Sequence, residues 1–159
     1  MVPGPINLPQ VKVESLIKKM KAFSSEPKTV RLSNGRLMTL NPPPAEPPRC
    51  RRCRETTTLY ITSPDNPNGN ARRPYYCCSW CDKFSVFADY RGNWVTNPRC
   101  DCWQSSKRQV TGIYNDHGNK VPGMVHFVCR LGKCGFNERK RRIVYQQDEY
   151  PSLIEDFII

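Results

Sequence analysis

The sequence has few histidines, no long apolar run and few acidic residues, and each shortage excludes a class of function. Two histidines in 159 residues leave little material for catalysis that depends on an imidazole base. No apolar stretch approaches the ~20 residues of a membrane-spanning helix, and the first thirty residues lack the pattern of a secretory signal. We therefore expect an intracellular protein with no membrane partner. The 14 acidic residues face 25 lysines and arginines, and a formal net charge of +11 favours nucleic acid ahead of anionic lipid as partner.

Proline and cysteine divide the chain at about residue 49. Nine of the 15 prolines precede that position, and all nine cysteines follow it. The Pro-rich stretch 41–48 is expected to form a stiff, extended linker. Ahead of it, apolar residues at helical spacing predict a short amphipathic helix over 10–23. Asn34-Gly35 between two β-rich segments predicts a hairpin with a type I′ turn.

Eight of the cysteines fall into two similar units. The first unit is Cys50-x2-Cys53 and, after 24 intervening residues, Cys78-x2-Cys81; the second is Cys100-x-Cys102 and, after 26 intervening residues, Cys129-x4-Cys134. Close cysteine pairs joined by β-rich segments are typical of a zinc ribbon, because two tight turns aim four thiolates at one ion. The repeat predicts two structural zinc ions per chain, held by Cys50, Cys53, Cys78, Cys81, Cys100, Cys102, Cys129 and Cys134.

Disulfides and buried free thiols are the alternatives to metal, and the absence of a visible export signal disfavours disulfides. The ninth cysteine is Cys77 or Cys78, and alignment of the units makes Cys78 the ligand. Four sulfurs already close each site, so His126 is expected to fill an aromatic strand position instead. A closed site has no open position for a reacting water, which makes the zinc structural. A strong chelator is then expected to unfold residues 50–140 together.

The expected fold is small, metal-stabilised and mainly β, with two tandem zinc ribbons built as three-stranded antiparallel sheets. A short helix and a β-hairpin precede them. The expected organisation is a helix-plus-hairpin module (1–40), the linker (41–48), a first ribbon (49–97), a second ribbon (98–146) and an acidic and apolar tail (147–159).

The segment from Asn68 to Cys78, with the Phe-Ala-Asp sequence ending at Asp89, resembles the GRF-type zinc finger, whose signature is Gly-Arg-x-Phe-Tyr-x-Cys. Residues 122–136 resemble a divergent copy, so the chain is similar to short tandem GRF-like fungal proteins of unassigned function. Fingers of this family bind single-stranded DNA, and the resemblance implies the same here. The signature arginine maps to Arg73, and the aromatics map to Tyr75 and Tyr76. The sequence departs from the signature at Arg72, in the glycine position; at Met124, in the second unit's arginine position; and at Trp103, where a glycine usually follows the cysteine.

Two functions from different classes remain open. The first is a non-enzymatic zinc protein that binds single-stranded DNA or RNA through the first ribbon, using Arg72, Arg73, Tyr75, Tyr76, Trp80, Arg91 and Trp103. The alternative is a zinc-stabilised adaptor that binds a protein partner through residues 1–40 and 151–159. Tyr60, Phe84 and Phe87 are expected in the core, and the run 139–142 favours the nucleus. An enzyme is not expected, because phosphate-binding glycine loops and deaminase motifs are missing. Two tetrathiolate sites would lower the net charge to about +7.

Overall fold

The computed structural model describes residues 26–32, 34–112 and 123–139, and these residues form eight strands and no helix. The strands are Lys28–Arg31 (β1), Leu37–Leu40 (β2), Thr58–Ile61 (β3), Pro74–Cys78 (β4), Lys83–Phe87 (β5), Lys107–Val110 (β6), Val125–Val128 (β7) and Asn137–Arg139 (β8). They build a two-stranded sheet, β1-β2, and two three-stranded sheets, β3-β4-β5 and β6-β7-β8, all antiparallel. The tandem-ribbon fold is confirmed. The helix expected over 10–23, most of the run 139–142 and the tail lie outside the described residues.

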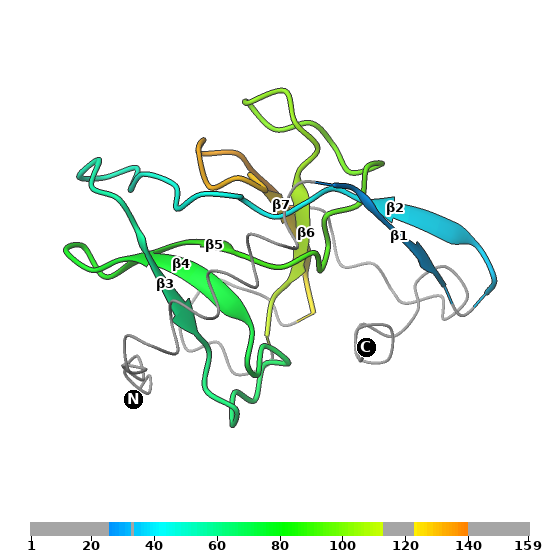
Figure 1. The fold of residues 1–159 in the computed structure, drawn as a ribbon, viewed down its shortest axis with the longest axis horizontal. Coiled ribbons are helices and arrows are strands. Elements are labelled where there is room, and N and C mark those ends of the chain that lie inside the picture. The colour runs from blue at the N-terminus through cyan, green and yellow to red at the C-terminus, as the bar shows by residue number, and fades with distance from the viewer. Residues whose placement is uncertain (1–25, 33, 113–122, 140–159) are drawn as a thin grey trace.

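The hairpin sits at one end of the molecule and the β3-β4-β5 sheet at the other, with β6 and β7 between them (Figure 1). No helix in the part of the chain that the structure describes is long and apolar enough to cross a membrane.

The two ribbons repeat each other at the level of single residues. The Thr62 N–H donates to the Arg73 carbonyl, and the Thr111 N–H donates to the Met124 carbonyl at the equivalent position. The residues just before these partners, Arg72 and Gly123, are both left-handed, with φ of 57° and 73°. The first ribbon therefore keeps the left-handed backbone of the signature glycine although an arginine stands there.

The hairpin forms, but its turn differs from the expected one. The Leu32 N–H donates to the Arg36 carbonyl, and the Gly35 N–H donates to the Leu32 carbonyl. Gly35 has a φ of 79°, whereas Asn34 is not left-handed, as a type I′ turn would require. The turn is a longer loop in which Gly35 is left-handed, a conformation that glycine adopts without steric cost.

The chain after the hairpin packs against both later parts of the molecule. Leu40 is fully buried and pairs with Trp94, and the Asn41 N–H donates to the Asn93 carbonyl. The Arg130 guanidinium, from the second ribbon, donates to the Pro42 carbonyl. The Pro-rich segment thus lies along the ribbons and is tied to them at Asn41 and Pro42.

The two ribbons approach each other closely at Gly132, in the loop between Cys129 and Cys134. A Cβ atom at this position would lie 2.7 Å from Ser85 Oγ, 3.0 Å from Val86 Cγ1 and 3.2 Å from Pro48 Cγ. Its φ of 69° also disfavours any side chain. The loop of the second ribbon therefore fits against β5 only because residue 132 is glycine.

Gly132→Ala is expected to destabilise the protein by more than Gly69→Ala. Both glycines have a φ of 69°, so both substitutions carry the left-handed penalty of roughly 1 kcal/mol, but a Cβ at Gly69 meets nothing within 4 Å. Overpacking against β5 adds about 1–3 kcal/mol at Gly132 alone. Urea unfolding of the zinc-loaded variants measures the difference, and equal destabilisation would show that the ribbons are not in contact there.

Candidate metal centres and nucleic-acid surface

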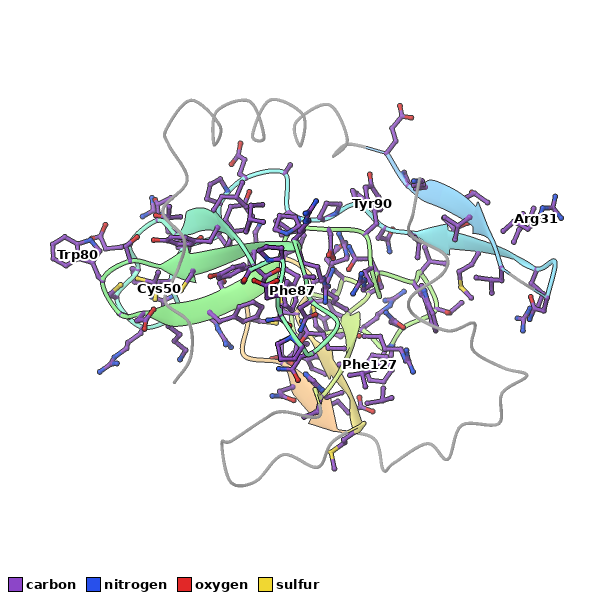
Figure 2. All side chains as sticks on the ribbon, turned by 90° about the horizontal axis from the view of Figure 1, so that it is seen from below. Arg31, Cys50, Trp80, Phe87, Tyr90 and Phe127 are labelled. Carbon is purple, nitrogen blue, oxygen red and sulfur yellow. The ribbon has the colours of Figure 1, made fainter. Side chains whose placement is uncertain are left out.

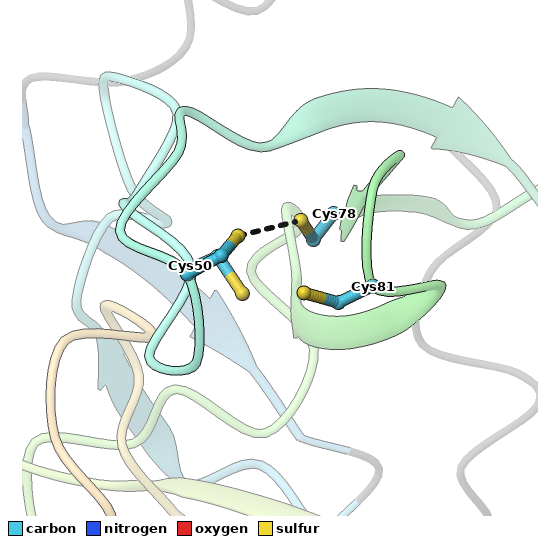
Figure 3. A group of neighbouring side chains, drawn as sticks. Cys50, Cys78 and Cys81 are labelled. Carbon is cyan, nitrogen blue, oxygen red and sulfur yellow. Dashed lines mark hydrogen bonds between the residues drawn. The ribbon is translucent and has the colours of Figure 1, made fainter.

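The first cysteine group is assembled from two turns of the first ribbon. Cys50 and Cys53 lie in a turn in which the Arg54 N–H donates to the Cys50 carbonyl, and Cys78 ends β4. The turn into β5 brings Cys81 alongside, and the sulfurs of Cys50, Cys78 and Cys81 point toward one another (Figure 3). All four sulfurs lie within 4.8 Å of one another.

The second group has the same construction in the second ribbon. Cys100 and Cys102 lie in a turn closed by the Trp103 N–H donating to the Cys100 carbonyl, and Cys129 follows β7. Cys134 completes the group, and its four sulfurs also lie within 4.8 Å of one another. The structure thus brings together the same eight cysteines that the repeat predicts.

The sulfur separations fit tetrathiolate metal sites. The Cys53 and Cys78 sulfurs are 3.4 Å apart, and those of Cys102 and Cys129 are 4.0 Å apart. Four sulfurs at the usual 2.3 Å from zinc are separated by about 3.8 Å in a tetrahedron, whereas a disulfide bond is about 2.05 Å. All nine cysteines are free thiols, which excludes the disulfide alternative in this structure.

Backbone amides prepare one thiol in each group for the thiolate form that a metal requires. The N–H groups of Cys53 and Arg52 lower the pKa of Cys50 to about 6. Burial raises the pKa of Cys129, but the backbone N–H groups of Cys134 and Lys133 outweigh it and lower that pKa to about 7. Such hydrogen bonds favour the anion, as expected of metal-binding turns.

A left-handed residue directly follows the second cysteine in three of the four turns. These residues are Arg54, Asp82 and Trp103, with φ of 68°, 47° and 60°. None is glycine, so each position carries a conformational penalty that the closed turn must offset. Apart from the unusual tryptophan, no pattern in the sequence predicts this strain.

Cys77 and His126 belong to neither group. Cys77 is buried on β4, and burial raises the pKa of its thiol, which makes it inert. His126 pairs with Gln109, with 3.1 Å between Nε2 and Oε1, and occupies the strand position predicted for it.

A buried ionic cluster joins the ribbons, and sequence reasoning missed it. The Arg73 guanidinium donates two hydrogen bonds to the Asp89 carboxylate, at 2.6 and 3.0 Å. Lys107, on β6, is fully buried and donates to the same carboxylate at 2.9 Å and to Asn93 Oδ1 at 3.0 Å. Burial alone raises the pKa of Asp89, but the charges of Lys107 and Arg73 hold it well below its usual value.

The same cluster changes the role expected of Arg73. Its guanidinium is buried, paired with Asp89 and stacked on the Phe87 ring at 3.7 Å from the centroid. Tyr76 is also buried and packs with Leu59 and Val86 in the core. Direct contact of either side chain with nucleic acid is therefore excluded in this conformation, which corrects the sequence-based expectation.

The other predicted contact residues lie at the surface to different degrees. Trp80 and Trp103 are 84% and 78% exposed, and Arg72 is exposed as well. Figure 2 shows Trp80 projecting from the end of the molecule that carries Cys50. Arg91 is half-buried and donates to the Gly69 carbonyl at 2.6 Å, so it braces the 64–70 loop.

One face of the first sheet carries a group of aromatic rings, which we call the aromatic face: Tyr60, Tyr75, Phe84 and Phe87. Tyr75 stacks on Tyr60 and Phe84 with centroids 5.7 and 5.9 Å apart, and Phe84 meets Phe87 edge-on at 5.0 Å. The expectation that Tyr60, Phe84 and Phe87 lie in the core is wrong, because Leu59, Tyr76 and Val86 fill it from the opposite face. Phe84 is 41% exposed and its neighbours are half-buried.

The described residues of the second ribbon form no equivalent aromatic face. By register, Tyr60 and Tyr75 correspond to Gln109 and His126. The opposite face replaces Leu59 with Arg108, which lies over Trp94 at 5.3 Å from the ring centroid. The two ribbons thus share a backbone and a metal-binding pattern but present different surfaces.

Three-stranded sheets that each join two cysteine turns define a tandem zinc-ribbon protein. Residues 47–91 match the family model of the GRF-like zinc ribbon domain. The first ribbon is therefore similar to that domain, and the second ribbon has the same topology and its own four-cysteine group, so the chain is a tandem zinc-ribbon protein.

One solved structure and the curated proteins complete the comparison. The crystal structure of human NEIL3 tandem zinc finger GRF domains matches with 24% identity over 60% of this chain and 100% of that chain. The TM-score of this match is 0.23. No curated protein matches this chain.

Proposed function

We propose that this protein is a non-enzymatic, zinc-stabilised module that binds single-stranded DNA or RNA through the first ribbon. The observation that carries the proposal is the aromatic face together with the exposed Trp80. Aromatic rings at the surface of a basic protein supply stacking platforms for bases, and stacking tolerates any base sequence.

The rings of the aromatic face lie where a single-stranded nucleic acid can reach them. The Tyr60 hydroxyl lies 3.3 Å from Ser79 Oγ, in the turn that also carries Trp80, so the aromatic face begins beside the exposed indole. Arg72, at the far end of β4, is exposed and follows the 64–70 loop. Bases stacked along this path would keep their phosphates near the positive charges of the first ribbon.

Arg73 packs against the aromatic face and supports it. Its guanidinium, fixed by Asp89, lies against Phe87 and holds that ring in place. We infer that the signature arginine acts here as a positioning residue for the aromatic face. This role makes Arg73→Glu a poor test of nucleic-acid contact, because the substitution would break the buried ion pair.

Trp80→Ala is expected to weaken binding of the full, zinc-loaded chain to a fluorescent 20-nucleotide oligothymidylate by about 5- to 150-fold. This range is the loss of roughly 1–3 kcal/mol for one stacked base. Anisotropy titrations at low salt measure the affinity. Since Trp80 is almost fully exposed, the variant should unfold at the same urea concentration as the wild type.

Leu37→Ala is the matched control, because Leu37 is also a large exposed apolar residue, 63% accessible, but lies in the hairpin. If Trp80→Ala and Leu37→Ala bind the oligothymidylate with equal affinity, Trp80 is not part of the binding surface. If the wild type fails to bind any single-stranded nucleic acid at low salt, nucleic-acid binding is rejected. The result would then favour the adaptor function that uses residues 1–40 and 151–159.

The absence of enzymatic activity and a nuclear location belong to the same proposal. Four sulfurs at each candidate zinc site leave no position for substrate or water. Imaging of the tagged chain, with and without the 139–142 run, tests the location.

A further inference from the structure

The two ribbons meet through their metal-binding turns. Arg51, between the cysteines of the first turn, donates from Nη1 to the Cys134 carbonyl at 2.9 Å. A Cβ built on Gly135 would lie 3.4 Å from the same nitrogen. The first turn of the first ribbon and the last turn of the second therefore meet in one surface, and Lys133 directly precedes the residue that Arg51 contacts.

This junction surface is strongly basic. It presents exposed cations from both ribbons: Arg49, Arg51, Arg52, Arg54 and Lys133. Among the described residues only two salt bridges occur, and both use Asp89. Glu55 is the acidic residue of the 49–55 segment and does not pair with any of these cations. Within the described part of the chain, no carboxylate forms a salt bridge with these exposed cations.

These cations do not serve to neutralise the negative charge of the cysteine sulfurs at the metal sites. In the first turn the Arg52 backbone N–H donates to Cys50 Sγ at 3.4 Å, so the hydrogen bond to this sulfur comes from the backbone and not from the guanidinium. The Arg51 guanidinium contacts a carbonyl oxygen of the other ribbon, and the Arg49 guanidinium contacts the Arg54 carbonyl. Neither guanidinium is directed at a cysteine sulfur by these hydrogen bonds.

We propose that the junction surface binds the phosphodiester backbone of a single-stranded nucleic acid, so that one strand engages both ribbons. The proposal rests on the proposed function and extends it beyond the first ribbon. Trp80 lies at the same end of the molecule as Cys50, next to this turn (Figure 2). Bases that stack on Trp80 therefore place their phosphates within reach of a surface to which the second ribbon contributes Lys133.

The test reverses one charge in each ribbon, with Arg52→Glu and Lys133→Glu combined. Neither side chain makes a hydrogen bond or ion pair with another described residue that the substitution would remove. Affinity for the labelled oligothymidylate is expected to fall about tenfold or more at low salt. The slope of log K against log salt should shrink by about 1.4, since each lost phosphate contact of a single strand removes about 0.7.

Arg31→Glu combined with Arg36→Glu is the matched control, because it makes the same change in net charge on exposed hairpin residues. Figure 2 places Arg31 at the opposite end of the molecule from Cys50. The control should keep the wild-type slope. If both double variants lose the same affinity, the effect is one of net charge and the junction proposal is overturned while the proposed function stands.

Elemental analysis separates a binding role from a metal-related one. The junction variant is expected to retain two zinc ions per chain, and the neutral pair Arg52→Gln and Lys133→Gln, which loses the same two phosphate contacts, should show a similar change of slope with a smaller loss of affinity. Loss of zinc in both pairs would assign the cations to the metal sites and overturn the proposal. Equal displacement of the oligonucleotide by poly-glutamate would overturn it too, and a wild type that binds no single strand would reject the proposed function itself.

Discussion

Chelation of zinc from the full chain is expected to unfold both ribbons in a single transition. The core cluster of the first ribbon consists of only Leu59, Tyr76, Val86 and Ala88. Structural zinc supplies apparent free energies of about 10–16 kcal/mol in small zinc fingers, as much as the whole stability of an ordinary domain. Circular dichroism during titration with a strong chelator, alongside zinc analysis, measures the transition. An unchanged spectrum after complete zinc removal would falsify the structural role of the metal.

Substitution of single cysteines tests whether the two sites depend on each other. Cys129→Ser removes a ligand from the second site and loosens the loop that carries Gly132, which packs on β5. Amide exchange at Val86 in the first ribbon should therefore become faster. Cys77→Ser is the control, because Cys77 is buried but belongs to neither group, and this variant should keep both zinc ions.

Asp89→Ala is expected to destabilise the protein by about 3–5 kcal/mol. The substitution leaves the fully buried Lys107 and the buried Arg73 without their shared anion, and an uncompensated buried charge is costly. Thermal or urea unfolding of the zinc-loaded variant measures the loss. Asp65→Ala is the control, since Asp65 is exposed and forms no ion pair among the described residues, and it should change stability by less than about 0.5 kcal/mol.

The destabilisation by Asp89→Ala should be smaller at pH 9 than at pH 6. Burial lowers the pKa of Lys107 to about 8, although the charge of Asp89 raises it in part. A folded-state pKa below the unfolded value of about 10.5 means that the unfolded chain binds more protons in that interval, so stability rises with pH there. Without Asp89 the pKa falls further, and a neutral amine is buried more easily than a cation. A destabilisation that is the same at both pH values would show that Lys107 does not carry the effect.

The cysteine pattern predicted the fold because each metal-binding turn is local. Two cysteines a few residues apart can converge on one ion whatever the rest of the chain does, and the β-rich segments between the pairs then have to cross. Cys78, rather than Cys77, joins its group since the two residues point to opposite faces of β4. The alignment of Arg72 with Gly123 was equally local and is reproduced in the backbone.

The surfaces were predicted less well, because the side that a strand buries depends on what packs against it. Tyr76 and Tyr75 are neighbours in sequence, and only the contact with Leu59 and Val86 places the first in the core and the second on the aromatic face. Side chains alternate between the two faces of a β-strand, and this alternation does not by itself determine which set faces the core.

By itself, the sequence determined the two four-cysteine sites, their order and the strands that join them, because these depend on spacing along the chain. Only the tertiary structure decided that Lys107 is buried against Asp89, that Gly132 seats one ribbon on the other, and that Arg51 and Lys133 share a surface. These features join residues that are 18 to 84 positions apart, so they depend on how the two ribbons pack together. Packing of this kind follows from the fit of complete surfaces, and no short pattern in the chain encodes it.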